Sequence, residues 1–387
     1  MNEMKARNFI ILIILLLAIT NVNAQSKDNV LQIVYTSDLH YGFFRKHFEG
    51  QDSVASYKAN AVMLRKINTL PGEQLPKDGG VAQGEKIGFI DDVIITGDIT
   101  NREEIPYQSA TISWQQFEDD YIHHLTLKNK SGQPTPLLLT PGNHDASNAI
   151  GYYKPMQPVT NPISMVNIYN LMIHPKTPKT IDNFDYYKDA VNYSRNIDGI
   201  HFMFLSLWPD STTRIWMEKD LAAVSLNTPV LLFTHVPPNG DPKHFFNPHT
   251  PPTINKKDKF ENLLQEHLKD SIADNEKPTD ILEQKEFVAF LKQHPNIKAY
   301  FHGHENANEY YDYTGVDNDI NLPVFRVDSP MKGKVSAKDE TMLSFQFIAI
   351  DPVKLLLTVR ECLWNKDKNP SSKIVWGKSK TISLKMK

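Results

Sequence analysis

Largely apolar runs of strand length recur along the chain, and most of them stop at a polar residue. They lie at residues 31–37, 91–97, 135–140, 201–208, 229–234 and 297–301. Runs this apolar are typical of strands covered on both faces, because a strand exposed on one face alternates apolar and polar residues. Helix-like segments follow the first two runs, at 55–70 and 113–125. The pattern therefore predicts a layered α/β fold.

The pattern changes beyond Leu322, where the runs PVFRVDS, LSFQFIAID and KLLLTVREC alternate or are rich in β-forming residues. Short breaks separate these runs, which favours an antiparallel ending. We expect this β-rich part from residue 322 to complete the main sheets. Two insertions interrupt the pattern, at 151–193, rich in Pro, Asn and Tyr, and at 237–259, rich in Pro and His. Such long loops are often lids or binding loops, with a plain surface excursion as the alternative.

The N-terminus has the layout of a secretory signal peptide. Lys5 and Arg7 precede an apolar core at 9–20, and small residues ending at Ala24 lie before Gln25. This core is short for a membrane span, which needs about 20 residues. We expect residues 1–24 to be cleaved, the protein to be exported to the periplasm or the extracellular space, and no integral membrane segment to remain. A retained anchor is the alternative.

Composition restricts the class of protein and its partners. The chain of 387 residues has 42 Lys and Arg against 45 Asp and Glu, a net charge of −3. The sequence has no excess of basic residues that would indicate nucleic acid as a partner. The length allows one large domain or two smaller ones, and we expect residues 25–387 to form a single domain. Cys362 is the only cysteine, so a disulfide framework and a cysteine-rich zinc site are both excluded.

Side chains that bind metals or move protons follow five of the apolar runs. In chain order they are Asp38, His40, Asp98, Asn143, His144, Asp145, His235, His302 and His304. Taken singly, each has a structural explanation, because carboxylates cap helices and turns, and a strand histidine is commonly a hydrogen-bonded core residue. In open α/β sheets, however, ligands bind beyond the carboxyl ends of the strands. Because five strand ends in one chain carry such residues, we favour a catalytic or metal-binding role over five separate structural roles. We interpret the histidines of helical or polar stretches as solvated surface: His123, His124, His174, His267 and His294.

Seven of these side chains form a donor set without a thiolate. The set comprises two carboxylates, one amide oxygen and four imidazoles, from Asp38, His40, Asp98, Asn143, His235, His302 and His304. Such donors suit zinc, manganese, iron or nickel. Seven donors are too many for one tetrahedral ion but suit two ions that share a carboxylate. Ions about 3.5–4 Å apart activate water and clamp the oxygens of a displacement at phosphorus.

The ordered series Asp-x-His, Gly-Asp, Gly-Asn-His-Asp, a single His and His-Gly-His resembles the calcineurin-like metallophosphoesterase superfamily, from Gln32 to Asn306. The resemblance implies a four-layer α/β/β/α sandwich of two mixed β-sheets flanked by helices. It also implies a metal-dependent phosphoric ester hydrolase with two divalent or trivalent ions (Mn, Fe or Zn). A small phosphorylated substrate, monoester or diester, would be hydrolysed by attack of a metal-bridging hydroxide.

The resemblance also assigns roles to the residues. The first ion would be held by Asp38, His40, Asp98 and His304, with Asp98 bridging, and the second would be completed by Asn143, His235 and His302. His144 would stabilise developing phosphate charge or protonate the leaving oxygen. Asp145 would orient the His144 ring. The last motif departs slightly from the family pattern, because its glycine lies between the two histidines.

Two other functions remain open. A catalytically silent binding or scaffold protein would keep the fold but typically loses ligands, whereas all seven and His144 are present. A metal-dependent amide hydrolase would keep the ions, but the HExxH helix of zinc proteases is absent. Aromatic and histidine side chains of the insertions either contact a substrate or pack the loops: Tyr152, Tyr153, Tyr186, Tyr187, Phe245, Phe246, His244 and His249.

Overall fold

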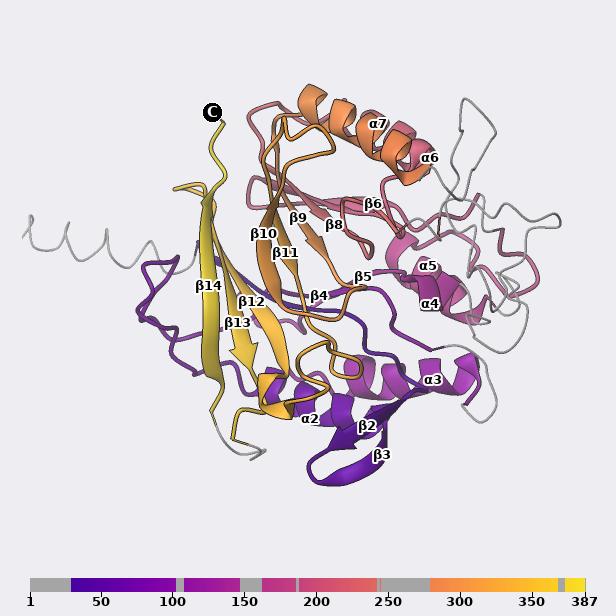
Figure 1. The fold of residues 1–387 in the computed structure, drawn as a ribbon, viewed down its shortest axis with the longest axis vertical. Helices are drawn as coiled ribbons and strands as arrows, with labels where there is room; N and C mark the ends of the chain where they lie inside the picture. Colours follow the sequence, from indigo (N-terminus) through magenta and orange to yellow (C-terminus); the bar gives the residue numbers. More distant parts are fainter. Residues whose placement is uncertain are drawn as a thin grey trace, which may run out of the picture.

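Two six-stranded sheets form the centre of the protein in a computed structural model (Figure 1). The structure describes residues 29–101, 108–146, 162–185, 188–241, 244, 279–367 and 373–386. The signal peptide prediction and most of the 237–259 insertion fall outside these residues. So do residues 151–161 and 186–187 of the other insertion, with all six aromatic side chains named above, His249 and His267.

The first sheet has the order β14-β13-β12-β1-β4-β5. Its strands are β1 (Leu31–Thr36), β4 (Asp92–Thr96), β5 (Leu137–Thr140), β12 (Ser344–Asp351), β13 (Leu356–Leu363) and β14 (Val375–Ser383). Strands β1, β4 and β5 run parallel, whereas β12, β13 and β14 are each antiparallel to their neighbours. The carboxyl ends of the three parallel strands therefore meet at one edge of this sheet.

The second sheet has the order β10-β11-β9-β8-β7-β6. Its strands are β6 (Tyr193–Ile197), β7 (Ile200–Phe204), β8 (Val230–Phe233), β9 (Ile297–His302), β10 (Glu309–Tyr313) and β11 (Leu322–Arg326). Strands β7, β8, β9 and β11 are parallel, and the edge strands β6 and β10 are antiparallel. Both sheets are therefore mixed, as the resemblance implies.

Aromatic side chains fill the space between the two sheets. The Tyr35 ring on β1 meets the edges of Phe233 on β8 and Phe301 on β9, with centroids 5.9 and 5.5 Å away. Phe233 and Phe301 stack on each other at 4.5 Å. All three side chains are fully buried. The apolar runs therefore face protein on both sides, which explains why they lack alternation.

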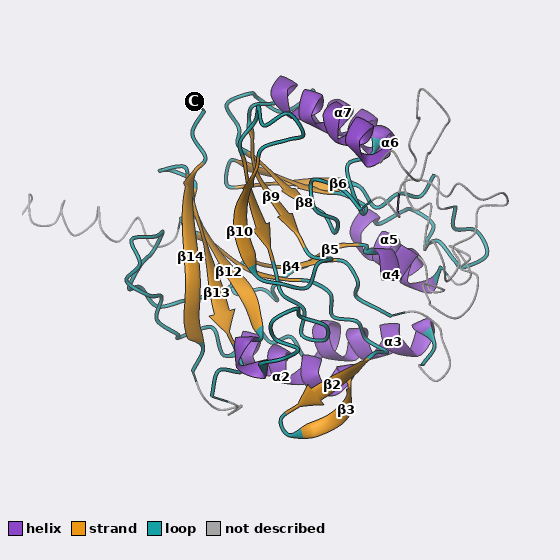
Figure 2. Ribbon diagram, in the orientation of Figure 1, coloured by secondary structure: helices purple, strands orange, loops and turns teal. Residues whose placement is uncertain are grey.

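Helices cover the outer sides of the two sheets, and the strands lie between them (Figure 2). The helices are α2 (Ser56–Asn68), α3 (Ala110–Phe117) with a π-helical continuation (Glu118–His123), α4 (Asn143–Ala146), α5 (Ile163–Ile173), α6 (Ser211–Leu221), α7 (Thr279–Gln293) and a 3₁₀ turn (Glu340–Met342). Helices α2 and α3 lie on one side of the sandwich, and α6 and α7 on the other (Figure 1). This arrangement confirms the predicted four-layer class. A separate hairpin, β2 (Phe44–Phe48) and β3 (Gln51–Ala55), follows β1.

Two sequence interpretations need correction. Strand β11, expected in an antiparallel ending, runs parallel to β9, because the unpredicted strand β10 reverses the chain first. His294 is not simply solvated: its side chain is 14% exposed and its Nε2 lies 3.0 Å from Glu218 Oε1. His123 and His124 are 65% exposed, as expected of surface residues. None of the helices in the described part of the chain combines the length and apolar composition of a membrane span.

Candidate metal centre

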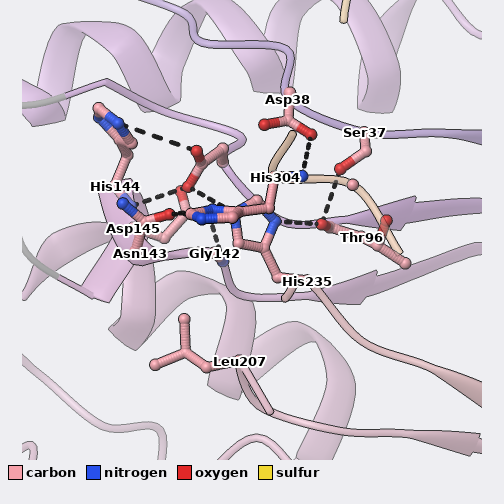
Figure 3. Close-up of polar contacts among 12 residues, drawn as sticks. Ser37, Asp38, Thr96, Gly142, Asn143, His144, Asp145, Leu207, His235 and His304 are labelled. Atoms are coloured by element: carbon pink, nitrogen blue, oxygen red, sulfur yellow. Dashed lines mark hydrogen bonds and ion pairs between the residues drawn. The ribbon is translucent and has the colours of Figure 1, made fainter. Parts of the chain in front are cut away.

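Five loops converge beyond the carboxyl ends of β1, β4, β5, β8 and β9. Backbone hydrogen bonds join these loops: Asp38 N donates to Gly97 O at 2.9 Å, His40 N to Asp98 O at 2.9 Å, and Gly303 N to His235 O at 3.1 Å. The side chains from these loops point toward one another (Figure 3). The structure thus brings the predicted strand-end residues into one place.

Glycine is required at two positions because backbones approach closely there. A Cβ on Gly142 would lie 2.3 Å from Asp98 Oδ1, and one on Gly303 would lie 2.3 Å from Asp38 Oδ2. Both distances are shorter than any real contact to a Cβ atom. The glycines of GNHD and HGH therefore let carboxylates sit directly against neighbouring loops.

Several candidate ligands have left-handed backbone angles, which residues other than glycine rarely adopt. The φ angles are 56° at Asp38, 46° at His40, 48° at Asp98 and 66° at His304. Such strained conformations cluster at functional sites, where the surrounding structure enforces them. Here the loop-to-loop hydrogen bonds provide that enforcement.

Asp98 lies between two groups of donor atoms. Its Oδ2 is 3.6 Å from His40 Nε2 and 3.9 Å from His144 Nε2. Its Oδ1 is 3.4 Å from His235 Nε2 and accepts a hydrogen bond of 2.8 Å from His144 N. His40 Nε2 also lies 3.7 Å from Asp38 Oδ1. One carboxylate therefore faces both groups.

The second group consists of Asn143, His235 and His304. Asn143 Oδ1 is 3.1 Å from His235 Nε2 and 3.1 Å from His304 Nδ1, and these two ring nitrogens are 3.2 Å apart. The other ring nitrogen of His235 donates to Thr96 O at 2.7 Å. That bond fixes the orientation of the ring and leaves Nε2 directed at the group.

His302 lies apart from this group, contrary to its expected role as a ligand. Its Nε2 is 2.9 Å from the Tyr311 hydroxyl and its Nδ1 is 2.9 Å from Gly303 O. Burial lowers the pKa of His302 well below its usual range, which Gly303 O opposes. The two histidines were expected to point the same way, as in an extended chain. Strand β9 ends at His302, and the left-handed turn at His304 breaks that alternation.

Asp145 also has contacts that differ from those expected. Its Oδ1 accepts hydrogen bonds from Thr100 N at 2.9 Å and Thr100 Oγ1 at 3.2 Å. Its Oδ2 accepts from Ile99 N at 3.1 Å and Gly142 N at 2.9 Å. The carboxylate therefore ties the GNHD turn to the loop after β4, instead of orienting the His144 ring as the resemblance implied.

Three residues beside the site were not among the predicted site residues, although for His244 the sequence leaves substrate contact open. Asp241 Oδ2 lies 2.9 Å from His304 Nε2, and the fully buried His244 ring is 5.2 Å from the His304 ring. Lys332 Nζ lies 3.3 Å from His144 Nε2. Asp241 and His244 belong to the proline-rich insertion and Lys332 to the loop after β11, where no apolar run marks a strand end. His244 was expected either to contact a substrate or to pack the loop. In the structure its ring lies beside the candidate ligand His304.

Histidines and burial set the ionisation of the carboxylates. Burial opposes the charge on Asp98, but His235, His144 and His40 together lower the pKa of Asp98 well below its usual range. Burial and the charge on Asp98 raise the pKa of Asp38 to about 6, with His235 opposing. Burial disfavours the charged His235 ring, yet Asp98, Asp38 and Thr96 O raise its pKa to about 9. These shifts favour a negatively charged Asp98 beside a positively charged His235.

The sequence model of calcineurin-like phosphoesterases matches residues 31–308. The chain belongs to this family. Members of this family are generally metal-dependent phosphoesterases that act on small phosphate substrates. No curated protein matches the chain at a significant level.

Solved structures of low sequence identity also match the chain. A predicted phosphoesterase from Streptococcus pneumoniae is 10% identical, with a TM-score of 0.32 over 92% of this chain and 98% of that one. The phosphopantetheinyl hydrolase from Mycobacterium tuberculosis is 12% identical, with a TM-score of 0.33 over 78% and 91%. A 5'-nucleotidase precursor from Thermus thermophilus is 9% identical, with a TM-score of 0.37 over 92% and 54%. None of these bears on the substrate of this calcineurin-like chain.

The donor atoms fit the divalent metals that the family uses. Three groups of His and Asp place one ligand atom from each member within 4.8 Å of the others: His40, Asp98 and His144; Asp38, Asp98 and His235; Asp241, His244 and His304. Asp38 Oδ1 is buried and accepts no hydrogen bond from the described residues. A buried carboxylate oxygen without such a bond costs free energy that a cation offsets. Carboxylate, amide and imidazole donors also match this class of metal.

Proposed function

We propose that this protein is a phosphoesterase whose Asp98 bridges two metal ions. The single observation that carries this proposal is the position of Asp98, whose two carboxylate oxygens face separate groups of donors at 3.4–3.9 Å. A carboxylate that served one ion only would not need histidines on both sides. Its lowered pKa keeps it ionised for this task.

The residues present divide into two sets around Asp98. Asp38 and His40 would hold the first ion, and Asn143, His235 and His304 the second. His304 replaces His302 in the second set, because His304 Nδ1 lies 3.1 Å from Asn143 Oδ1 and 3.2 Å from His235 Nε2, whereas the ring nitrogens of His302 face Gly303 O and the Tyr311 hydroxyl. When bound, two such ions would polarise water and neutralise the oxygens of a phosphoryl group.

His144 would act on the substrate. Its backbone N–H is held by Asp98, and its ring lies against His40 with centroids 4.8 Å apart. The ring therefore stands beside the donor set at a fixed angle, where it can donate a hydrogen bond to a phosphoryl or leaving-group oxygen. Asp145 would hold the GNHD turn that carries it. A positioned imidazole of this kind contributes about 10²–10⁴ in rate.

A hydrolysis assay tests the proposal. Purified protein is supplied with Mn²⁺, and release of p-nitrophenol is followed from p-nitrophenyl phosphate and from bis-p-nitrophenyl phosphate. We expect hydrolysis of at least one probe, abolished by EDTA and restored by Mn²⁺. A protein that binds two ions yet hydrolyses neither probe would instead be a binding or scaffold protein with this fold.

We also propose that the protein is exported. The support is the basic, apolar and small-residue order of residues 1–24. Mass spectrometry of the protein from its native source should find an N-terminus at Gln25. An intact N-terminus on Met1 in a membrane fraction would favour a retained anchor.

A further inference from the structure

We propose that Lys332 and the adjacent cavity form the subsite for the leaving group of a small phosphate ester, an inference that rests on the proposed function. The cavity has a volume of 280 Å³ and is lined by Phe43, Phe44, Arg45, Lys46, His47, Met331, Lys332 and Ala337. It combines aromatic and apolar walls with the basic side chains of Arg45, Lys46, His47 and Lys332. Those are the groups that would bind an aryl or other compact apolar leaving group beside a phosphate.

The cavity adjoins the metal centre at two points. Lys332 Nζ lies 3.3 Å from His144 Nε2, so a phosphoryl oxygen that reaches one of these groups is within reach of the other. On the opposite wall, the Phe43 ring lies 6.2 Å from the His40 ring, and Phe43 N donates to His40 O at 3.0 Å. A substrate bound at the metals would therefore extend into this cavity.

The lysine is held in place by hydrogen bonds of its loop. Ser329 Oγ donates to Asp38 O at 2.8 Å and accepts from Met331 N and Lys332 N at 3.1 Å each. This single hydroxyl links the lysine backbone directly to a candidate metal ligand. Lys332 Nζ also lies over the Phe43 ring, 5.2 Å from its centroid. The ammonium is thus aimed along the cavity wall toward His144.

Arg45, on β2, connects this strand to the loop that carries Lys332. This guanidinium is 2% exposed and donates to Pro330 O at 2.9 Å, Met331 O at 3.4 Å and Ser336 O at 2.5 Å. The strand that carries Phe44 is therefore fixed to the loop that carries Lys332. A cavity held on both sides in this way is a pre-formed site.

Cavity size restricts the ligand. Pockets for drug-sized ligands have about 300–1,000 Å³, so 280 Å³ suits a single ring or a short chain. A second cavity of 530 Å³ is lined by residues that include Ile297, at the amino end of β9, and lies away from the metal centre. Its position gives it no access to the scissile bond. The substrate class we infer is a small phosphate ester with an aryl or compact apolar leaving group.

Phosphonate binding tests this subsite without requiring turnover. Phenylphosphonate and methylphosphonate are titrated calorimetrically into the Mn²⁺-loaded protein. We expect phenylphosphonate to bind about tenfold more tightly, because its ring is buried. In Lys332→Ala both ligands should bind about tenfold to a hundredfold more weakly, because a charged hydrogen bond is lost. Lys332→Arg should recover part of this loss.

Matched variants separate the two walls of the subsite. Lys338→Ala removes the same charge from an exposed position of the same loop and should leave both affinities unchanged. Phe44→Ala, at a side chain 41% exposed, should weaken phenylphosphonate alone, whereas Tyr57→Ala, at 43%, lies outside the cavity and should weaken neither. Thermal unfolding of each variant verifies that it is folded.

The outcomes distinguish the subsite from the proposed activity. If the protein hydrolyses p-nitrophenyl phosphate but Lys332→Ala binds both phosphonates as tightly as Lys338→Ala, the subsite is wrong and the phosphoesterase stands. If binding depends on Lys332 but no phosphate ester is hydrolysed, the proposed activity is wrong, and the cavity binds a phosphate ester without serving a leaving group. Equal affinities of the two phosphonates in the wild type would overturn the leaving-group cavity.

Discussion

Strand β4 begins at Asp92 and leads into Asp98, and both carboxyl groups are buried, with residue exposures of 6% and 2%. At the amino end, burial and the neighbouring Asp91 raise the pKa of Asp92 to about 7, against partial opposition from Lys130 and Arg195. At the carboxyl end, histidines overcome burial and lower the pKa of Asp98 well below its usual range.

Burial alone therefore does not identify a carboxylate with a functional role. Both ends of β4 remove a carboxyl group from water, which by itself favours the neutral form. Only at the carboxyl end do the loops after β1, β5 and β8 bring three imidazoles within 3.9 Å of the oxygens. The charge at that end is thus stabilised by partners gathered from across the sandwich, and the following variants test that contrast.

The largest expected effect is that of Asp98→Asn. The substitution keeps the shape but removes the charge that faces both donor groups. Changing residues that merely support metal ligands costs about 10–100-fold in affinity, so we expect Mn²⁺ affinity to fall by more than that and hydrolysis to disappear. Bound metal is measured by plasma mass spectrometry after gel filtration. Asp92→Asn, the same change at the other end of β4, should keep wild-type metal content.

His144→Ala should reduce turnover by about 10²–10⁴ while metal content stays near the wild-type value. The reason is that its ring stands beside the donors and faces Lys332. Steady-state kinetics and metal analysis are carried out on the same preparation. Loss of metal together with activity would show that His144 is a ligand, a possibility that its grouping with His40 and Asp98 makes worth checking.

Asp241→Asn should weaken metal binding by about 10–100-fold, because a carboxylate that bonds to the far nitrogen of a ligating histidine fixes its orientation. A matched control is Asp220→Asn, since Asp220 Oδ2 lies 2.7 Å from Nε2 of the buried His201, away from the donor groups. Calorimetric titration with Mn²⁺ should separate the two variants. Equal affinities in both would mean that Asp241 has only a structural role.

The smallest effect concerns stability at the amino end of β4. The pKa of Asp92 in the folded protein is about 7, above the ordinary value of 3.8. Folding therefore takes up protons at this group, and its ionisation destabilises the protein as pH rises from about 4 through 7. Asp92→Asn should raise the free energy of unfolding at pH 8 by about 1 kcal/mol or more relative to its effect at pH 4.5. Urea unfolding of metal-free protein measures this. A difference independent of pH would contradict the assignment.

The sandwich could be predicted from the sequence because its central strands are mostly apolar and show no regular alternation with polar residues. Each of the six apolar runs contributes to a strand, and the motif residues follow strand ends where parallel strands open to ligands. Strand β10 escaped prediction because the exposed Glu309 and Asp312 interrupt its tyrosines, of which only Tyr313 is buried. Because β10 was not predicted, β11 was expected in an antiparallel ending, whereas it runs parallel to β9.

Within the site, the sequence identified which loops meet but not how each ring turns. His302 and His304 are equivalent in the sequence pattern, and only the end of β9 and the left-handed angle at His304 separate them. Asp145 was paired with its neighbour in the chain, although its partners lie on the loop after β4. Lys332 lies 188 residues from His144, and no local pattern announces such a contact.

Counting the ions at saturation tests the bridging role of Asp98 most directly. Wild-type protein freed of metal is titrated calorimetrically with Mn²⁺, and hydrolysis of p-nitrophenyl phosphate is measured at each step. We expect two ions to bind per chain, and hydrolytic activity to appear as the second site fills. A limit of one ion per chain, or two ions still bound by Asp98→Asn, would contradict it.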